Sequence, residues 1–310
     1  MRGPRRDTRG IVDAAGLLAR VRFRRRLPES AALRPYVEHY WLIDWELEEP
    51  YVTRVLPHPS VNAVFSDLDG AGPVGEVAGV GRGLFSIRLA GRGRVSGVQF
   101  RPGGFHPFLR PPSPVSGLTD RHVPFGEIFT GTAPDTPARV LAPGDEGARI
   151  AALDGVLREL LAAGAGPDRR VPYVIGLLDR IRHDRSVCRV ADLARREGLS
   201  VRGLQRLFAE YVGVGPKWVI LRYRLQEALE RAAPGHKVDW ARLAADLGYS
   251  DQSHLIRDFT STVGTAPSDY AACAGPAPHV TRNATPGLTR TATPGTTPGT
   301  AAASATATAS

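Results

Sequence analysis

Apolar positions recur at helical spacing twice between residues 190 and 270, and the two copies are in register. Each copy has a short apolar helical face, a Gly-x-Ser turn, a longer apolar face and a Gly-x-x-Pro end. Leu193 corresponds to Leu243, 50 residues later, whereas Leu204 corresponds to Leu255, 51 residues later. One residue is therefore inserted just after the serine of the second turn. A pattern that repeats at a fixed offset predicts two copies of one structural unit.

Each copy predicts two helices joined by a tight turn. Gly198 permits the positive φ that the chain needs after the first helix, and Ser200 is a candidate N-cap for the next one. We expect the apolar faces to point into a core, with Val201, Leu204, Phe208 and Tyr211 inward in the first copy and Leu243, Leu247, Leu255 and Phe259 inward in the second. Two helices joined by a short turn with glycine are typical of a DNA-reading unit.

Polar side chains occupy the opposite face of the second helix in each unit. These are Arg202, Gln205 and Arg206 in the first unit and Gln252, Ser253 and Arg257 in the second. Arginine fits the O6 and N7 acceptors of guanine, and glutamine fits the N6 and N7 groups of adenine. Both faces therefore have the chemistry needed to read base edges.

The arrangement resembles the AraC/XylS family of bacterial transcription regulators. The stretches that carry the resemblance are ADLARREGLSVRGLQRLFAEYVGVGPKWVILRYRLQEAL and ARLAADLGYSDQSHLIRDFTSTVGTAPSDY, about a third of the chain. The resemblance implies a DNA-binding domain over residues 172–272 with a linker helix over 217–232. It also implies that the DNA-facing positions are Arg202, Gln205, Arg206, Gln252, Ser253, His254 and Arg257. The alternative is a plain helical domain. Two units in register, joined by a linker helix, make this alternative less favourable.

Residues 22–163 predict a separate β-rich domain that makes the fold class α+β. Segments 37–47, 52–65 and 83–100 are rich in aromatic and β-branched residues and are broken by Gly and Pro, as in short strands. We interpret Gly-Arg-Gly at 81–83 and at 91–93 as loop corners. Segments 105–109 and 125–129 predict short helical or turn pieces. Residues 150–163 predict an amphipathic helix, with Ala151, Leu153, Val156, Leu157, Leu160 and Leu161 on its apolar face.

This front domain also resembles a known sequence type. LPHPSVNAVFS, VSGVQFRPGGFHPFL and LTDRHVPFGEIF are similar to an uncharacterised N-terminal domain that is often fused to AraC-type units. The resemblance implies a β-rich regulatory domain and names no ligand. Pro59 follows His58 where many relatives carry Gly, which puts the form of that turn in doubt.

Charge is unevenly placed along the chain. The formal net charge is +9, and residues 1–26 carry nine arginines against Asp7 and Asp13. We expect residues 1–21 to be a basic, disordered leader, either simply solvated or in non-specific contact with phosphates. Residues 164–171 predict a linker. Residues 273–310 are mainly Ala, Thr, Pro, Gly and Ser, with two arginines and Leu288, so we expect a disordered tail.

The chain shows no signature of an enzyme, a metal site or a membrane protein. His58, His106 and His122 lack metal-ligand spacing. Arg101-Pro102-Gly103-Gly104 predicts a turn, with anion binding as the alternative. Two cysteines, Cys188 and Cys273, cannot form a disulfide framework, and no run of 18 apolar residues occurs, so we expect a cytoplasmic protein without a cofactor.

The leading hypothesis is a sequence-specific regulator of transcription. Its expected partners are double-stranded DNA, RNA polymerase and an unknown small-molecule or protein effector at the front domain. Two alternatives stay open: an enzyme or metal sensor in the front domain, and a front domain that binds another protein.

Overall fold

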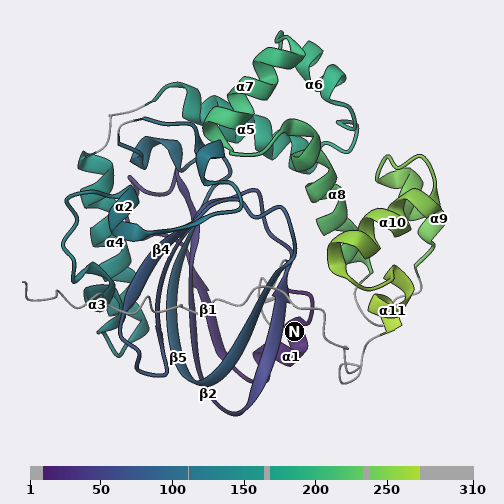
Figure 1. Ribbon diagram of the computed structural model, residues 1–310. Coiled ribbons are helices and arrows are strands. Elements are labelled where there is room, and N and C mark those ends of the chain that lie inside the picture. The colour runs from purple at the N-terminus through teal and green to yellow at the C-terminus, as the bar shows by residue number, and fades with distance from the viewer. Residues whose placement is uncertain (1–9, 111, 164–167, 233–237, 273–310) are drawn as a thin grey trace, which may run out of the picture. The chain divides into compact units, whose positions relative to one another are not determined.

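A six-stranded antiparallel sheet forms the centre of the front domain (Figure 1). The computed structural model describes residues 10–110, 112–163, 168–232 and 238–272. The strand order is β1-β2-β5-β3-β4-β6, with bounds β1 Arg22–Arg26, β2 Val37–Val55, β3 Asn62–Leu68, β4 Val74–Ala78, β5 Phe85–Phe100 and β6 His122–Pro124. The three predicted β-rich segments therefore all contribute strands. Segment 52–65 is divided between β2 and β3.

The second Gly-Arg-Gly is not a loop corner, contrary to our prediction, because it lies inside β5. A Cβ atom on Gly93 would come within 2.1 Å of the Trp45 ring, and one on Gly97 within 2.0 Å of the Trp41 ring. Both tryptophans belong to β2, the strand paired with β5. These glycines therefore make room for indole rings lying over the sheet. The first Gly-Arg-Gly, at 81–83, does lie in a loop.

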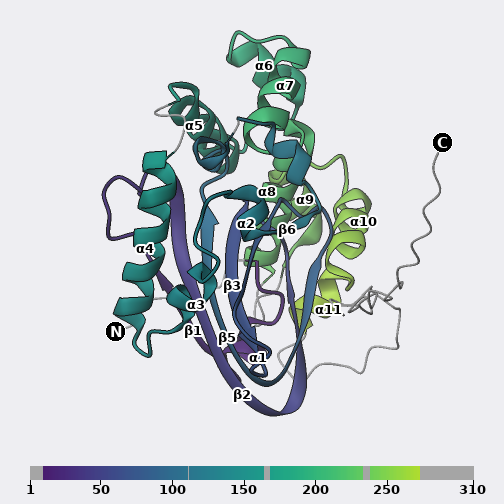
Figure 2. The ribbon, with the colours of Figure 1, turned by 60° about the vertical axis from the view of Figure 1, so that its left-hand side comes forward.

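One face of the sheet carries an aromatic core covered by helices. The Phe105 and Phe108 rings each meet the Phe100 ring edge to face, with centroids 4.9 and 5.1 Å from its centroid. The covering elements are η1 His106–Phe108, η2 Val115–Leu118, α2 Phe125–Ile128, α3 Thr136–Leu141 and α4 Glu146–Ala163, of which α3 and α4 stand beside the sheet in Figure 2. The short pieces predicted at 105–109 and 125–129 are confirmed.

Helix α4 is fixed to the sheet by a buried arginine. Arg149 is 2% exposed; its Nη1 donates to both carboxylate oxygens of Asp44, and its Nη2 donates to the carbonyl of Val95 and to Ser96 Oγ. Burial lowers the pKa of Arg149, and Asp44 partly offsets that effect. The predicted apolar face of this helix holds for Leu153, Val156 and Leu157, whereas Ala151 is exposed and was wrongly assigned.

The other face of the sheet is covered by a segment that we expected to be disordered. Residues Ala14–Leu18 form helix α1, whose N-cap Asp13 accepts a hydrogen bond from the Gly16 amide. Leu17 is 2% exposed and packs in one cluster with Phe23 and Trp45. The arginine-rich composition hid this short apolar stripe. The expectation for residues 1–9 lies outside the described residues.

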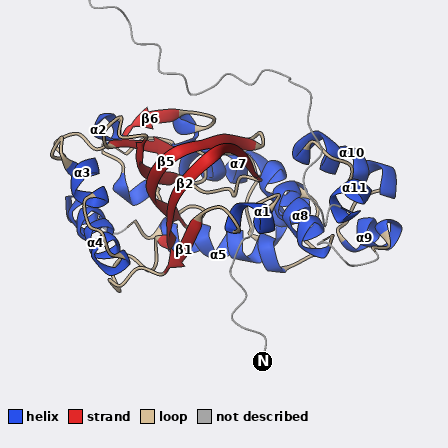
Figure 3. Cartoon of the chain, turned by 90° about the horizontal axis from the view of Figure 1, so that it is seen from below, coloured by secondary structure: helices blue, strands red, loops and turns tan. Residues whose placement is uncertain are grey.

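Helices make up the remainder of the described chain, as Figure 3 shows by colour. They are α5 Arg170–His183, α6 Val190–Arg196, α7 Val201–Tyr211, α8 Pro216–Arg231, α9 Trp240–Asp246, α10 Gln252–Val263 and α11 Pro267–Ala272. The predicted linker helix over 217–232 is α8, which begins one residue earlier. Of the linker predicted over 164–171, residues 164–167 lie outside the described residues, whereas residues 170–171 belong to α5. The predicted tail at 273–310 also lies outside the described residues. Within the described chain, no helix is both long and apolar enough to cross a bilayer.

Candidate nucleic-acid interface

The first candidate reading helix, α7, begins as the sequence predicts. Gly198 has a φ of 65° and lets the chain reverse after α6. The side-chain oxygen of Ser200 then accepts a hydrogen bond from the Gly203 amide at 3.0 Å. This cap satisfies one of the open amides of the first helical turn. The turn therefore fixes where α7 starts and which face it presents.

The inward face of α7 is nearly as predicted. Leu204 and Phe208 are fully buried and Tyr211 is 2% exposed. Val201 is 40% exposed, so its inward assignment was wrong. It has the periodicity of an inward residue, but as the first residue of the helix, next to the exposed Ser200, it lies outside the core.

The outward face of α7 brings three predicted site residues together. Arg202, Gln205 and Arg206 are all exposed, and together with Ser200 and Ala209 they line one open hollow on the helix surface. A long arginine side chain at position 202 could instead pack over Trp218 or Tyr211. The structure gives that role to Arg222, whose guanidinium lies 4.5 Å from the Trp218 ring centroid. Arg202 is therefore left on the open face.

The inserted residue caps the second candidate reading helix, α10. Asp251 is its N-cap and accepts a hydrogen bond from the His254 amide at 2.7 Å. That hydrogen bond lowers the pKa of Asp251. Ser250, the counterpart of Ser200 in the repeat, instead lies 3.1 Å from the Nδ1 atom of His254. The extra residue therefore replaces a serine cap by a carboxylate, which also suits the positive end of the helix dipole.

The buried and the exposed side chains of α10 lie on different faces of the helix. Leu255, Phe259 and Val263 are fully buried, while the predicted site residues Gln252, Ser253, His254 and Arg257 are all exposed. The Nε atom of Arg257 donates to the Ser253 carbonyl at 3.3 Å.

Both reading units are built on α8. Val219, Ile220 and Tyr223 of α8 belong to the core that contains Leu204 and Phe208. Leu225, Ala228 and Leu229, two turns further on, belong to the core that contains Leu255 and Phe259. One helix therefore carries both α7 and α10.

The candidate residues of the front domain have local partners. His58 Nδ1 lies 2.9 Å from Ser60 Oγ, and His122 Nδ1 lies 2.9 Å from Glu76. Among the residues that the structure describes, no three His, Cys, Asp or Glu side chains are grouped as a metal site. Arg101–Gly104 forms a turn, closed by a hydrogen bond from the Gly104 amide to the Arg101 carbonyl.

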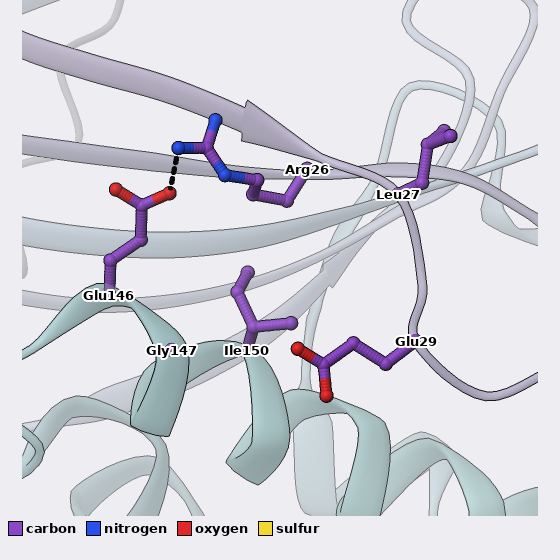
Figure 4. A pocket seen from close by; sticks show the side chains of 6 residues that line it. All are labelled: Arg26, Leu27, Glu29, Glu146, Gly147 and Ile150. Carbon is purple, nitrogen blue, oxygen red and sulfur yellow. Dashed lines mark ion pairs between the residues drawn. The ribbon is translucent and has the colours of Figure 1, made fainter.

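A shallow hollow in the front domain is too small for a typical metabolite site. It measures about 150 Å³ and lies between the end of β1 and the start of α4 (Figure 4). The ion pair of Arg26 and Glu146, at 2.6 Å, forms part of its wall. Ligand pockets usually measure roughly 300–1,000 Å³. The hollow therefore gives no support to a small-molecule site there.

Several solved structures are similar to this chain or to parts of it, and no curated protein matches it. ToxT from Vibrio cholerae is 12% identical and has a TM-score of 0.39, covering 75% of this chain and 97% of ToxT. The C-terminal domain of AraT, a response regulator from Geobacillus stearothermophilus, is 21% identical with a TM-score of 0.31, covering 34% of this chain and 87% of that domain.

Two family models match separate parts of the chain. Residues 25–124 match a domain of unknown function (DUF6597). Residues 193–272 match a helix-turn-helix domain, and this segment runs from within α6 to the end of α11 and includes both candidate reading helices. The chain therefore carries a helix-turn-helix domain of the AraC/XylS family of transcription regulators behind a domain of unknown function.

Proposed function

We propose that this protein is a sequence-specific transcription regulator that reads two adjacent major-groove segments, one with α7 and one with α10. The observation that carries the proposal is the pair of exposed polar faces on two capped helices supported by one helix, α8. Major grooves accept an α-helix whose N-terminal residues contact base edges. Two such helices on one support can engage one duplex.

The two faces read different bases in this proposal. Arg206 and Arg257 occupy equivalent places in the repeat and are suited to guanine. Gln205 is suited to adenine, but its counterpart in the second unit is Ile256. Val201, which we had placed in the core, is exposed beside Arg202 and can contact a thymine methyl group. The position of Val201 directly after the cap was the signal for that exposure.

We further propose that the front domain controls DNA binding through the end of α7. The His106 ring lies 4.5 Å from the Tyr211 ring, and the Tyr211 hydroxyl donates to Asp168 at 2.7 Å. Thr119 Oγ1 donates to the carbonyl of Gly213, two residues after α7, at 2.6 Å. An effector or protein partner that moves these front-domain segments would act directly on the first reading unit. Action on RNA polymerase is part of the same proposal.

Selection of bound DNA from a random pool by the full chain tests the function. We expect enrichment of one composite site with two different elements. The control is the same selection with Arg206 and Arg257 both replaced by alanine, which should lose the enriched sequence while keeping weak, salt-sensitive binding. A wild-type chain that enriches no sequence would refute the proposal.

A further inference from the structure

The turn between α5 and α6, residues 184–189, is fixed to helix α8. Arg224 of α8 is 2% exposed, and its Nη2 atom donates to the carbonyl oxygens of Asp184 at 2.8 Å and Val187 at 3.2 Å. The carboxylate of Asp184 also pairs with Arg196 of α6 at 3.1 Å. Because charged hydrogen bonds join it to α8 and to α6, this α5–α6 turn has a defined position beside the first reading unit.

A series of ion pairs runs from the α5–α6 turn along α8 to the second unit. The Nη2 atom of Arg185 lies 2.6 Å from Oε1 of Glu227, and the Nη2 atom of Arg231 lies 2.7 Å from the same oxygen. The Nη1 atom of Arg231 lies 3.0 Å from Oδ2 of Asp246, the last residue of α9. Arginines and carboxylates therefore alternate without interruption from the turn to the second unit.

The same turn also touches the second unit directly. A Cβ atom on Gly248 would come within 2.4 Å of Cys188 Sγ and within 3.3 Å of its Cβ. The backbone of the α9–α10 turn therefore lies against the cysteine side chain, whose Sγ donates to the Arg185 carbonyl at 3.1 Å. The ion pairs and this contact reach the second unit at neighbouring positions, Asp246 and Gly248.

The α9–α10 turn is joined in its own unit to the second reading helix. The hydroxyl of Tyr249, the residue after Gly248, donates to Asp258 Oδ2 of α10 at 2.7 Å. Asp251, two residues further on, caps the same helix. A contact that fixes the position of the turn therefore also affects the direction in which α10 leaves it.

The second unit also packs on α8 through apolar side chains. Leu225, Ala228 and Leu229 of α8 belong to one cluster with Leu243 and Leu255. Apolar burial is non-directional, so it favours association of the second unit with α8 more than it favours one angle between them. Hydrogen bonds weaken steeply when their geometry changes. The charged hydrogen bonds are consequently better suited to fix that angle.

We propose that these inter-unit contacts, the ion pairs from Arg185 to Asp246 and the Cys188–Gly248 contact, orient the second reading helix and thereby set the spacing between the two DNA elements. Glu227, which accepts from two arginines, is the central positioning residue. The inference rests on the proposed reading of two elements by one chain. It implies that the selected spacing depends on residues outside both reading faces.

The main test compares Glu227→Gln with the wild-type full chain on DNA whose two elements are at the selected spacing, one base pair closer or one base pair further apart. The variant keeps the size of the side chain but loses the charge that the two arginines share. We expect roughly 5-fold weaker binding at the selected spacing, as for the loss of partly exposed ion pairs. The other two spacings should change little, so the preference for one spacing flattens. An unchanged preference would overturn the proposal.

Asp192→Asn is the matched control for charge. It removes a carboxylate from an ion pair with Arg195, at 2.6 Å, that lies entirely within α6. Because this variant and Glu227→Gln change the net charge equally, a general change in attraction to DNA is common to both. Asp192→Asn should keep the wild-type spacing preference. Equal flattening by the two variants would contradict a positioning role for Glu227.

A disulfide tests the direct contact between the units. In a Gly248→Cys variant with Cys273→Ser, the added thiol should bond to Cys188 on treatment with oxidised glutathione, because the two Cβ atoms would lie 3.3 Å apart, near the roughly 3.5–4.5 Å of disulfides. The oxidised form should bind the selected spacing at least as tightly as the reduced form. The reduced form is the control for the strain of a side chain at a φ of 75°. Failure of the disulfide to form, or loss of binding on oxidation, would overturn the proposal.

A measurement without DNA distinguishes failure of the positioning from failure of the proposed function. Spin labels at Ala191→Cys on α6 and Ser261→Cys on α10, both exposed positions, report the distance between the units once the two native cysteines are replaced by serine. Glu227→Gln should broaden the distance distribution and Asp192→Asn should not. An unchanged distribution refutes the positioning. A wild-type chain that selects no two-element site, with a distribution that still broadens, refutes the proposed function and keeps the orienting role of the contacts.

Discussion

At the scale of single residues, the outward arginines carry the proposed reading of bases. Arg206 and Arg257 are exposed at equivalent places on α7 and α10. Replacing either by alanine should cost about 1–3 kcal/mol of binding free energy and relax specificity at one base pair, because a bidentate pair with guanine is lost. Titration of the selected site and its single-base variants checks this. Arg195→Ala, at an exposed position on α6, is the control, and a loss that is uniform across sequences would indicate a phosphate contact instead.

A second residue-scale prediction concerns the Asp44 carboxylate. Asp44→Ala should lower the free energy of unfolding by about 3 kcal/mol, because it leaves the buried Arg149 guanidinium without its counter-charge. Urea unfolding at neutral pH measures the difference. Glu146→Ala, which removes partly exposed ion pairs with Arg26 and Arg24, should cost less than about 1 kcal/mol. Similar losses for the two variants would contradict the role of Asp44.

Residue-level inference from sequence worked where periodicity and packing agree. Phe208 and Phe259 are fully buried as predicted, because the middle of a helix packed on a core obeys the helical repeat. Val201 and Ala151 were predicted to be buried but are exposed. Periodicity gives the face of a helix, but it does not show how far along the helix the neighbouring core extends. The pairing of Tyr249 with Asp258 was not anticipated, because a tyrosine in a turn and an aspartate in a helix are individually unremarkable.

At the scale of elements, the caps distinguish the two units. Asp251→Ala should lower the melting temperature of the full chain more than Ser250→Ala does, since Asp251 caps α10 and Ser250 does not. Ser200→Ala should cost about 1 kcal/mol through the loss of the α7 cap. Circular dichroism melts of the three variants check this order. A larger effect of Ser250→Ala would indicate that Ser250, and not Asp251, caps α10.

The cores of the units give a second element-scale prediction. Phe259→Ala should cost roughly 3–5 kcal/mol and unfold the second unit first, because its cluster is separate from the one that contains Phe208. Hydrogen exchange of α9 and α10 amides reports that local unfolding. Val201→Ala, at an exposed helix position, is the matched control. If exchange rises equally in α7 and α10, the units do not unfold separately.

Elements were predictable from sequence to unequal degrees. The helices of the helix-turn-helix region have clear apolar stripes, turn glycines and caps, and the linker helix predicted over 217–232 is α8, Pro216–Arg231. In the front domain the order of strands and the length of β2 and β5 were not predictable, because glycines that usually end strands here lie under Trp41 and Trp45. Helix α1 was hidden for a similar reason: the neighbouring arginines dominated the composition, while three apolar residues decided the packing.

At the scale of the whole molecule, the arrangement of two different reading helices on one support predicts the operator. Helix α8 has 16 residues, which span about 24 Å at 1.5 Å per residue. With the radii of the two units added, the reading helices come to lie about one DNA turn apart, roughly 34 Å. A single chain should therefore contact two neighbouring major-groove segments on one side of the duplex. The site should be asymmetric, because Gln205 and Ile256 differ at equivalent positions.

Changing the phase of the two elements tests this geometry. Insertion of about five base pairs, half a turn of DNA, between the elements should abolish tight binding, because the second element then faces away from α10. Insertion of about ten base pairs returns the second element to the original side of the duplex but leaves the two elements too far apart. Tight binding by a monomer should therefore also be lost, since a helix such as α8 cannot stretch. Footprints and affinities on the three spacings provide the measurement, with scrambled second elements as the matched control. A short palindromic footprint centred on one element would contradict the prediction, because it would require two chains that each use a single unit.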